Sequence, residues 1–195
     1  MKRWIIAGAL TKSQIDEVAA LLRSGGIVLM PTDTIYGLHA LANDDSAARV
    51  ADIKGREEGK RFVVVGASVD QLEAMGAEVP DALRRIWPAP LSAVMRRGDS
   101  TIAARIPALD WLRELLEQTG PLFSTSANRS GKPPITEPSD LEPKLLEQLD
   151  GLIDAGRING KASAIVDFTG TEPRFIRDGE PRFTQFLRKT LSKKL

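Results

Sequence analysis

The sequence predicts an α/β fold with a mixed, twisted sheet and flanking helices. Helical segments alternate with short apolar runs through most of the chain, whereas three such runs cluster late, at residues 151–154, 164–167 and 174–177. Regular alternation is typical of a parallel sheet, so the late cluster favours a mixed one. The length of 195 residues suits a single domain over residues 1–195, with a core over about residues 10–180. A simple doubly wound sheet is the alternative.

Helices are predicted where apolar residues recur every three or four positions between breakers. Thr11 and Gln14 resemble a capping box before the first of these segments, and the glycines at 25–26 end it. Asn43 or Asp44 can cap the second. The predicted helices cover residues 11–24, 43–54, 69–75, 80–87, 109–119, 141–149 and a basic C-terminal segment, 184–195.

Strands are predicted where short apolar runs lie between turn signals. Residues 27–30 contain no polar side chain, which is typical of a strand buried on both faces. Gly98 and Asp99 predict a turn between two neighbouring strands. The predicted strands cover residues 27–30, 62–65, 91–95, 101–106, 121–123, 151–154, 164–167 and 174–177.

The composition excludes several classes of site. Lys+Arg 27 against Asp+Glu 26 gives a net charge of +1, so no global attraction to polyanions is expected. The sequence contains no cysteine, which excludes disulfides and thiolate chemistry, and the single histidine, His39, cannot form a histidine metal cluster. We expect His39 to be structural or to stand behind a site. No segment resembles a signal peptide or a membrane span, so we expect a cytoplasmic protein without a membrane partner.

Two polar segments follow apolar runs and are candidate ligand loops, residues 31–38 and 124–131. Ligands of open α/β sheets bind just outside strand ends. Hydroxyls and one carboxylate mark the first segment, and Asp33 could join a Mg²⁺ shell. Ordinary turns are the alternative for both segments.

Cations gather after the second helix, at Lys54, Arg56, Lys60 and Arg61. The glycine spacing and the absence of a following Ser or Thr exclude a P-loop, so the choice is between phosphate binding and a solvated charged turn. Arg105 lies within an apolar run, where a buried charge requires an internal carboxylate or a bound anion.

Read together, four motifs resemble the YrdC-like family in its short, single-domain TsaC type. They are Pro31-Thr-Asp-Thr-Ile-Tyr-Gly-Leu38, Lys54-Gly-Arg56 with Lys60, Thr101-Ile-Ala-Ala-Arg105-Ile-Pro107 and Ser124-Thr-Ser126-Ala-Asn128-Arg-Ser-Gly131. The resemblance runs from about Gly25 to Gly179. It implies a twisted mixed sheet around a concave basic cavity.

The resemblance implies a nucleotidyltransferase, threonylcarbamoyl-AMP synthase. Such an enzyme joins L-threonine, bicarbonate and ATP, accompanied by Mg²⁺, and releases pyrophosphate. Its partner would be a tRNA-modifying threonylcarbamoyl transferase complex, and direct binding of tRNA stays open. The implied catalytic residues are Lys54, Arg56, Ser126 and Asn128; the implied ATP site is Arg56, Lys60, Thr101, Ser126 and Arg177; the implied threonine site is Thr34, Arg105, Ser124 and Ser163.

The chain departs from the family pattern at several positions near these motifs, namely His39, Arg61, Ala89, Pro134, Ala164 and Asp178. Two alternatives therefore stand beside the synthase. One is a paralogue that acts on another amino acid. The other is a non-catalytic RNA-binding module of the same fold, whose binding would weaken steeply with salt.

Overall fold

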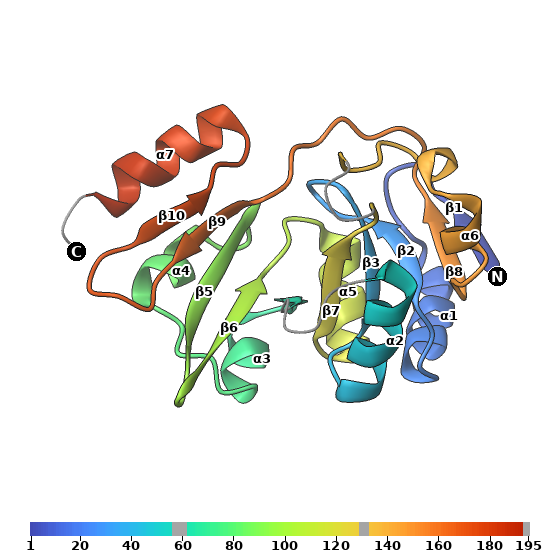
Figure 1. Ribbon diagram of the computed structural model, residues 1–195, viewed down its shortest axis with the longest axis horizontal. Coiled ribbons are helices and arrows are strands. Elements are labelled where there is room, and N and C mark those ends of the chain that lie inside the picture. The colour runs from blue at the N-terminus through green and yellow to red at the C-terminus, as the bar shows by residue number, and fades with distance from the viewer. Residues whose placement is uncertain (56–61, 129–132, 193–195) are drawn as a thin grey trace.

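The computed structural model describes residues 1–55, 62–128 and 133–192 (Figure 1). Its strands are β1 (Lys2–Ile5), β2 (Val28–Pro31), β3 (Tyr36–Leu41), β4 (Val63–Val65), β5 (Leu91–Arg97), β6 (Ser100–Arg105), β7 (Leu122–Ser126), β8 (Gly151–Asp154), β9 (Ala164–Asp167) and β10 (Arg174–Arg177). They form one sheet in the order β1-β8-β2-β3-β7-β4-β6-β5-β9-β10. Some neighbouring strands are parallel, such as β4 with β6, and others are antiparallel, such as β4 with β7. The predicted mixed sheet is confirmed.

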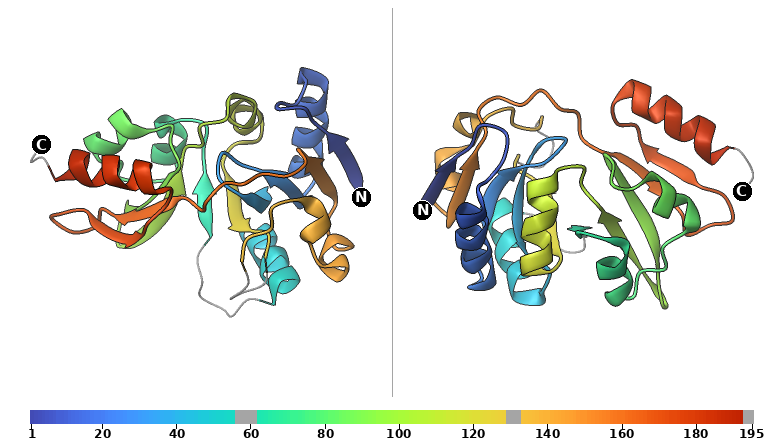
Figure 2. Two further views of the ribbon diagram at one scale, coloured as in Figure 1. Left: turned by 90° about the horizontal axis from the view of Figure 1, so that it is seen from above. Right: turned by 180° about the vertical axis from the view of Figure 1, so that it is seen from behind.

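Helices cover both faces of the sheet. They are α1 (Lys12–Arg23), α2 (Asp44–Lys54), α3 (Val69–Ala74), α4 (Asp81–Ile86), α5 (Asp110–Thr119), α6 (Pro143–Leu146) and α7 (Pro181–Leu191), with a 3₁₀ turn at Pro138–Asp140. In the half of the sheet that contains β2 and β7, α1 and α5 lie on one face and α2 and α6 on the other (Figure 2). The predicted capping box starts α1, because the backbone N–H of Thr11 donates to the Gln14 side chain at 2.9 Å and Gln14 N–H donates back at 3.3 Å.

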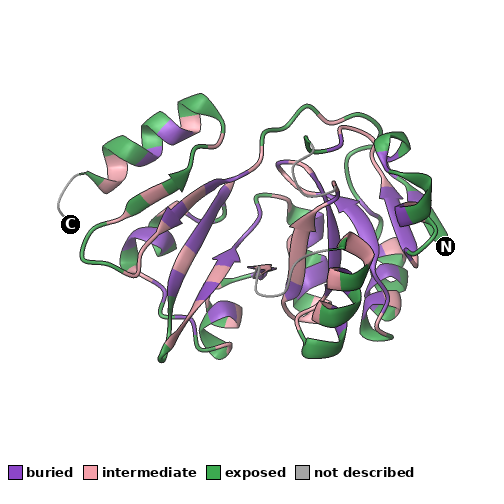
Figure 3. Ribbon diagram, viewed as in Figure 1, coloured by how far each residue is buried: buried purple, intermediate pink, exposed green. Residues whose placement is uncertain are grey.

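Strand β2 shows how the sheet divides the core. All four of its residues are buried, as the apolar run predicted. Val28 and Met30 pack with α1 and α5, whereas Leu29 packs on the opposite side with residues of α2 and α6. This alternation follows from the two-residue period of a strand. Buried side chains accordingly run along the central strands, and the outer faces of the helices are exposed (Figure 3). A further cluster joins β5, β6 and β9 to α3, α4 and α7.

Several elements differ from the sequence prediction. Residues 124–126, predicted as the start of a loop, belong to β7, and the predicted helix 141–149 forms only α6 (Pro143–Leu146). The predicted loop at residues 31–38 is a hairpin turn, with Pro31 in β2 and residues from Tyr36 onward in β3. The prediction failed because β3 is buried on both faces and mixes Gly and His with apolar residues, so it lacks an alternating pattern. Strand β1 was also missed, and its buried Trp4 extends the core before residue 10. The C-terminal helix begins earlier than predicted, at Pro181, and ends at Leu191.

A crossing segment, residues 155–163, connects β8 near one end of the sheet to β9 near the other (Figure 1). The buried Tyr36 hydroxyl fixes its start by donating to Gly156 O at 2.9 Å and accepting from Ala155 N–H at 3.0 Å. Further along, a Cβ on Gly160 would lie 1.6 Å from the carbonyl oxygen of Thr34. The segment therefore packs against the β2–β3 turn at a distance that only glycine allows.

Within the described ranges, none of the helices has the length and apolar character that crossing a membrane requires.

Candidate functional site

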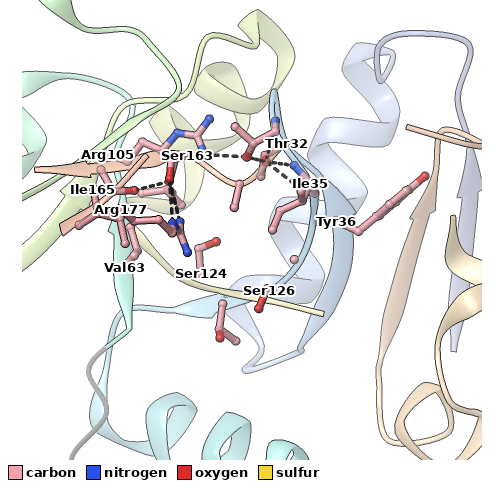
Figure 4. Close-up of a pocket in the computed structure, with 16 residues that line it drawn as sticks. Thr32, Ile35, Tyr36, Val63, Arg105, Ser124, Ser126, Ser163, Ile165 and Arg177 are labelled. Atoms are coloured by element: carbon pink, nitrogen blue, oxygen red, sulfur yellow. Dashed lines mark hydrogen bonds between the residues drawn. The ribbon is translucent and has the colours of Figure 1, made fainter. Parts of the chain in front are cut away.

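A cavity of about 280 Å³ opens between the two halves of the sheet (Figure 4). Its walls come from the β2–β3 turn, from β7, from β6 and from the end of the crossing segment with β9 and β10. Residues that line it include Thr32, Thr34, Val63, Ser92, Arg105, Ser124, Ser126, Ser163, Ile165 and Arg177. The cavity thus brings together all four residues of the predicted threonine site and two of the predicted ATP site.

Sheet register explains why residues so distant in sequence meet here. Ser124 on β7 pairs with His39 on β3 and with Val63 on β4. Ile165 on β9 pairs with Ser92 on β5 and with Arg177 on β10. Directly paired residues present their side chains to the same face of a sheet. Each row of pairs therefore brings side chains from several strands to one side of the sheet.

Arg105 is the most constrained charge of the cavity. It is only 5% exposed, forms an ion pair with Asp33 and donates from Nη1 to Thr34 Oγ1 at 2.9 Å. Its Nε donates to the carbonyl oxygen of Ala89 at 3.4 Å. The internal carboxylate that the sequence left as one alternative is therefore present. Two of its five N–H groups remain for a ligand in the cavity.

The same contacts bear on the predicted magnesium role of Asp33. One carboxylate oxygen accepts from Arg105 and the other accepts from the backbone N–H of Ala108 at 3.1 Å. A carboxylate engaged by a guanidinium is a poor ligand for a hard cation, so Asp33 does not fit that role in this arrangement. Within the described ranges, no three His, Asp or Glu side chains gather as a metal site.

Arg177 supplies a second guanidinium. Its Nε and Nη2 donate to the carbonyl oxygen of Ser163 at 3.1 and 2.9 Å, and it forms no ion pair with any described residue. Burial, followed by the positive charge of Arg105, lowers the pKa of Arg177. With two guanidiniums against the single carboxylate of Asp33, the cavity carries an excess positive charge that favours an anion.

Hydroxyl groups line the space around these charges. Thr34 Oγ1 lies 2.8 Å from Thr32 Oγ1, which donates to the carbonyl oxygen of Ile35 at 2.9 Å. The buried hydroxyls of Ser92 and Ser163 lie 2.9 Å apart. Sequence reasoning missed Ser92 as a lining residue, although a serine within the apolar run of β5 was the available signal.

His39 lies behind the cavity wall, as expected. It is fully buried, its Nδ1 lies 3.1 Å from the carbonyl oxygen of Gly37, and its Nε2 lies 3.1 Å from Ser124 Oγ. Burial, which dominates, lowers the pKa of His39 to about 4, with a further contribution from Arg105. The imidazole is therefore neutral near pH 7.

The remaining predicted site residues lie outside this cavity or outside the described residues. Lys54 ends α2, and its Nζ donates to Thr125 Oγ1 at 3.3 Å and to the carbonyl oxygen of Ser126. Thr125 alternates with Ser124 and Ser126 along β7, so Lys54 reaches this strand from the opposite face. Thr101 lies at the start of β6, on the same face as Arg105 but farther along the strand. Arg56 and Lys60 lie outside the described residues, as does Arg61.

Asn128 lines a second pocket of about 320 Å³ together with Pro134, Ile135 and Leu145. Of the predicted catalytic residues, Ser126 therefore lines the first cavity and Asn128 lines this second pocket. Pro134, one of the departures from the family pattern, forms part of the second pocket wall.

Two other departures have structural roles. Ala164 is buried, and a Cβ on Gly179 would lie 2.6 Å from the backbone nitrogen of Ala164. Gly179 therefore packs closely against β9. Asp178 forms an exposed ion pair with Arg188 of α7 at 2.8 Å. Neither side chain lines the first cavity.

Several known proteins resemble this chain in sequence and in fold. A family model of Sua5, YciO and YrdC proteins, described as "Telomere recombination", matches residues 20–179. A threonylcarbamoyl-AMP synthase of Pyrococcus abyssi is 32% identical over 183 residues, which cover 85% of this chain and 54% of that protein. One of Xanthomonas campestris pv. campestris strain B100 is 32% identical over 192 residues, covering 89% and 96% of the two chains.

Among solved structures, Pyrococcus abyssi Sua5 complexed with L-threonine matches with a TM-score of 0.86 and 27% sequence identity. The match covers 99% of this chain and 62% of that one. The chain thus spans little more than half the length of both Pyrococcus abyssi proteins. Because the family model matches most of its length, the chain belongs to the Sua5/YciO/YrdC family.

Proposed function

We propose that this chain synthesises threonylcarbamoyl-AMP. Carbon–nitrogen bond formation between L-threonine and bicarbonate yields N-carboxythreonine and water. A carboxylate oxygen of that carbamate then attacks the α-phosphorus of ATP, the bond from the α-phosphorus to the bridging oxygen breaks, and pyrophosphate leaves. The product would be passed to a threonylcarbamoyl transferase complex that modifies tRNA, and direct binding of tRNA remains a separate possibility.

The observation that carries the proposal is the charge pattern of the first cavity. An α-amino acid presents a carboxylate, an amine and, in threonine, a hydroxyl. The cavity offers two guanidiniums with one internal carboxylate, and hydroxyls from Thr34, Ser124 and Ser163. A relative with the same fold is described as complexed with L-threonine, which supports threonine as the amino acid.

The role of the protein in this reaction is to position two reactants and to stabilise charge. No protein nucleophile is required, which agrees with a chain that lacks cysteine. Correct placement alone can supply roughly 7–11 kcal/mol of the barrier. Lys54, Arg56 and Lys60 would stabilise the phosphates, while Ser126 and Asn128 would orient the carbamate and the α-phosphate. Mg²⁺ would accompany ATP, and the protein would act in the cytoplasm.

The direct test incubates the protein with ATP, Mg²⁺, bicarbonate and single amino acids, and measures pyrophosphate and the acyl-AMP product. Threonine-dependent release of pyrophosphate is expected. Release with a different amino acid alone would identify a paralogue. No release with any amino acid, combined with salt-sensitive binding of RNA, would identify the binding module and refute the proposal.

Two arginine variants test the assignment of the cavity. Loss of a charge-assisted hydrogen bond costs about 1.5–3 kcal/mol, which is roughly 10- to 150-fold in binding. Arg105→Ala should raise the KM for threonine by that factor, and Arg177→Ala should raise the KM for ATP. Arg174→Ala is the control, because Arg174 also lies on β10 but is exposed, with an ion pair to Asp167 at 2.9 Å. If Arg105→Ala leaves the threonine KM unchanged, Arg105 has only a structural ion pair.

A further inference from the structure

The contact between His39 and Ser124 determines which hydrogen-bonding group the cavity wall presents. The two residues are directly paired across β3 and β7, so their side chains share one face. His39 fits there because Gly37, on the same face two residues earlier, has no side chain. A Cβ at position 37 would lie 3.0 Å from His39 Cε1 and 3.0 Å from the carbonyl oxygen of Thr125.

The partners of the imidazole fix its tautomer. A backbone carbonyl can only accept, so the Nδ1 that lies 3.1 Å from Gly37 O must carry the proton. Because full burial keeps the ring neutral near pH 7, Nε2 holds a lone pair. The Ser124 hydroxyl must then donate its hydrogen to Nε2, across 3.1 Å. Ser124 is left with lone pairs alone for the cavity.

These hydrogen-bond directions make the cavity asymmetric. Arg105 and Arg177 present N–H donors, whereas Ser124 presents an acceptor. An α-amino acid matches this arrangement, because its carboxylate accepts and its ammonium, or the hydroxyl of threonine, donates. A ligand with a methyl group at this point would leave the Ser124 oxygen without a partner, which weakens binding by about 10- to 100-fold.

We propose that His39 is a positioning residue that fixes the Ser124 hydroxyl as a hydrogen-bond acceptor for a donor group of the amino acid substrate. The inference rests on the proposed function for the identity of that substrate. The donor is the ammonium or the side-chain hydroxyl, and the experiment distinguishes them.

The first measurement needs no substrate. His39 is the only histidine of the sequence, so labelling untagged protein with ¹⁵N-histidine gives signals from one imidazole. At neutral pH, the nitrogen shifts should show a protonated Nδ1 and an unprotonated Nε2, and Ser124→Ala should move the Nε2 signal. An Nε2–H tautomer or an imidazolium at neutral pH overturns the proposal.

The second measurement compares two substitutions of His39 by the KM for threonine and for 2-aminobutyrate, which lacks the hydroxyl. His39→Leu removes the acceptor and retains bulk, whereas His39→Gln can place an acceptor oxygen near the Nε2 position. The leucine variant should raise the threonine KM by about 10- to 100-fold, and the glutamine variant should restore it. An equal rise for both amino acids identifies the ammonium as the donor; a rise for threonine alone identifies the hydroxyl.

If His39 has only a structural role, the KM values of the variants follow a different pattern. In a Ser124→Ala background, His39→Leu should add nothing to the KM if His39 acts through Ser124. An additive effect, an unchanged KM in the leucine variant, or failure of glutamine to restore it overturns the proposal. Absence of threonine-dependent turnover in the wild type refutes the proposed function and with it the substrate role of His39. The tautomer measurement tests the direction of the hydrogen bond between Ser124 and His39 independently of that result.

Discussion

Acidification should destabilise this protein through His39, by an amount that follows from its burial. The pKa of His39 is lowered to about 4 in the folded protein, against 6.5 for an ordinary histidine. Between these two values the unfolded chain binds a proton that the folded protein does not, so the free energy of unfolding falls as pH falls. At 1.36 kcal/mol for each pKa unit, the loss approaches roughly 3 kcal/mol near pH 4 and vanishes above about pH 7.

The assay is urea denaturation at several pH values from about 7.5 to 4.5, for the wild type and for His39→Gln. Glutamine does not titrate, so the difference between the two proteins isolates His39 from the carboxylates that also change charge in this range. The difference in free energy of unfolding should shift in favour of the glutamine variant as the pH falls. Curves that stay parallel throughout would show that the folded protein accepts a proton on His39 as readily as the unfolded chain does, and would refute the argument from burial.

Three other substitutions test separate parts of the structure. Gly160→Ala should lower the free energy of unfolding by about 1–3 kcal/mol and raise the threonine KM, because the added Cβ would collide with the carbonyl of Thr34. Gly170→Ala, whose Cβ has no neighbour closer than 3.7 Å, is the control in thermal unfolding and kinetics. Thr11→Ala should lower the free energy of unfolding by about 1 kcal/mol in urea titrations, because the α1 cap is lost. An unchanged free energy of unfolding would show that this cap does not stabilise the protein. Arg56→Ala should reduce threonine-dependent pyrophosphate release by about 10²–10³, and turnover like that of the wild type would remove Arg56 from the catalytic set.

The course of most helices and strands could be predicted because the signals are local. The helix from Lys12 to Arg23 follows from a capping box, a repeat of buried apolar residues and a closing glycine pair. The strand Val28–Pro31 follows from an uninterrupted apolar run. Strand β3 could not be predicted in this way. Neighbours on both sides and both faces bury all of its residues except Leu41, and burial by distant segments leaves no periodic pattern.

The partners of the site residues depend on register and could not be read from the chain. Asp33 and Arg105 are 72 residues apart, and His39 and Ser124 are 85 apart. A shift of one residue in the pairing of β3 with β7 would turn His39 away from Ser124, since successive side chains of a strand point to opposite faces. The sequence could therefore present Arg105 as a buried charge in need of a partner, yet could not choose between a carboxylate and a bound anion.

By itself, the sequence determined which groups are available, namely guanidiniums, hydroxyls and one histidine in motifs that resemble a known family, together with the elements that carry them. Only the tertiary structure decided which of these groups pair with one another and which of them donate or accept hydrogen bonds. The ion pair of Arg105 joins β6 to Asp33 in the β2–β3 turn, and the acceptor-only state of Ser124 arises from the contact of β7 with β3. The sequence could not fix either one, because the direction of a hydrogen bond depends on every group that surrounds its two atoms.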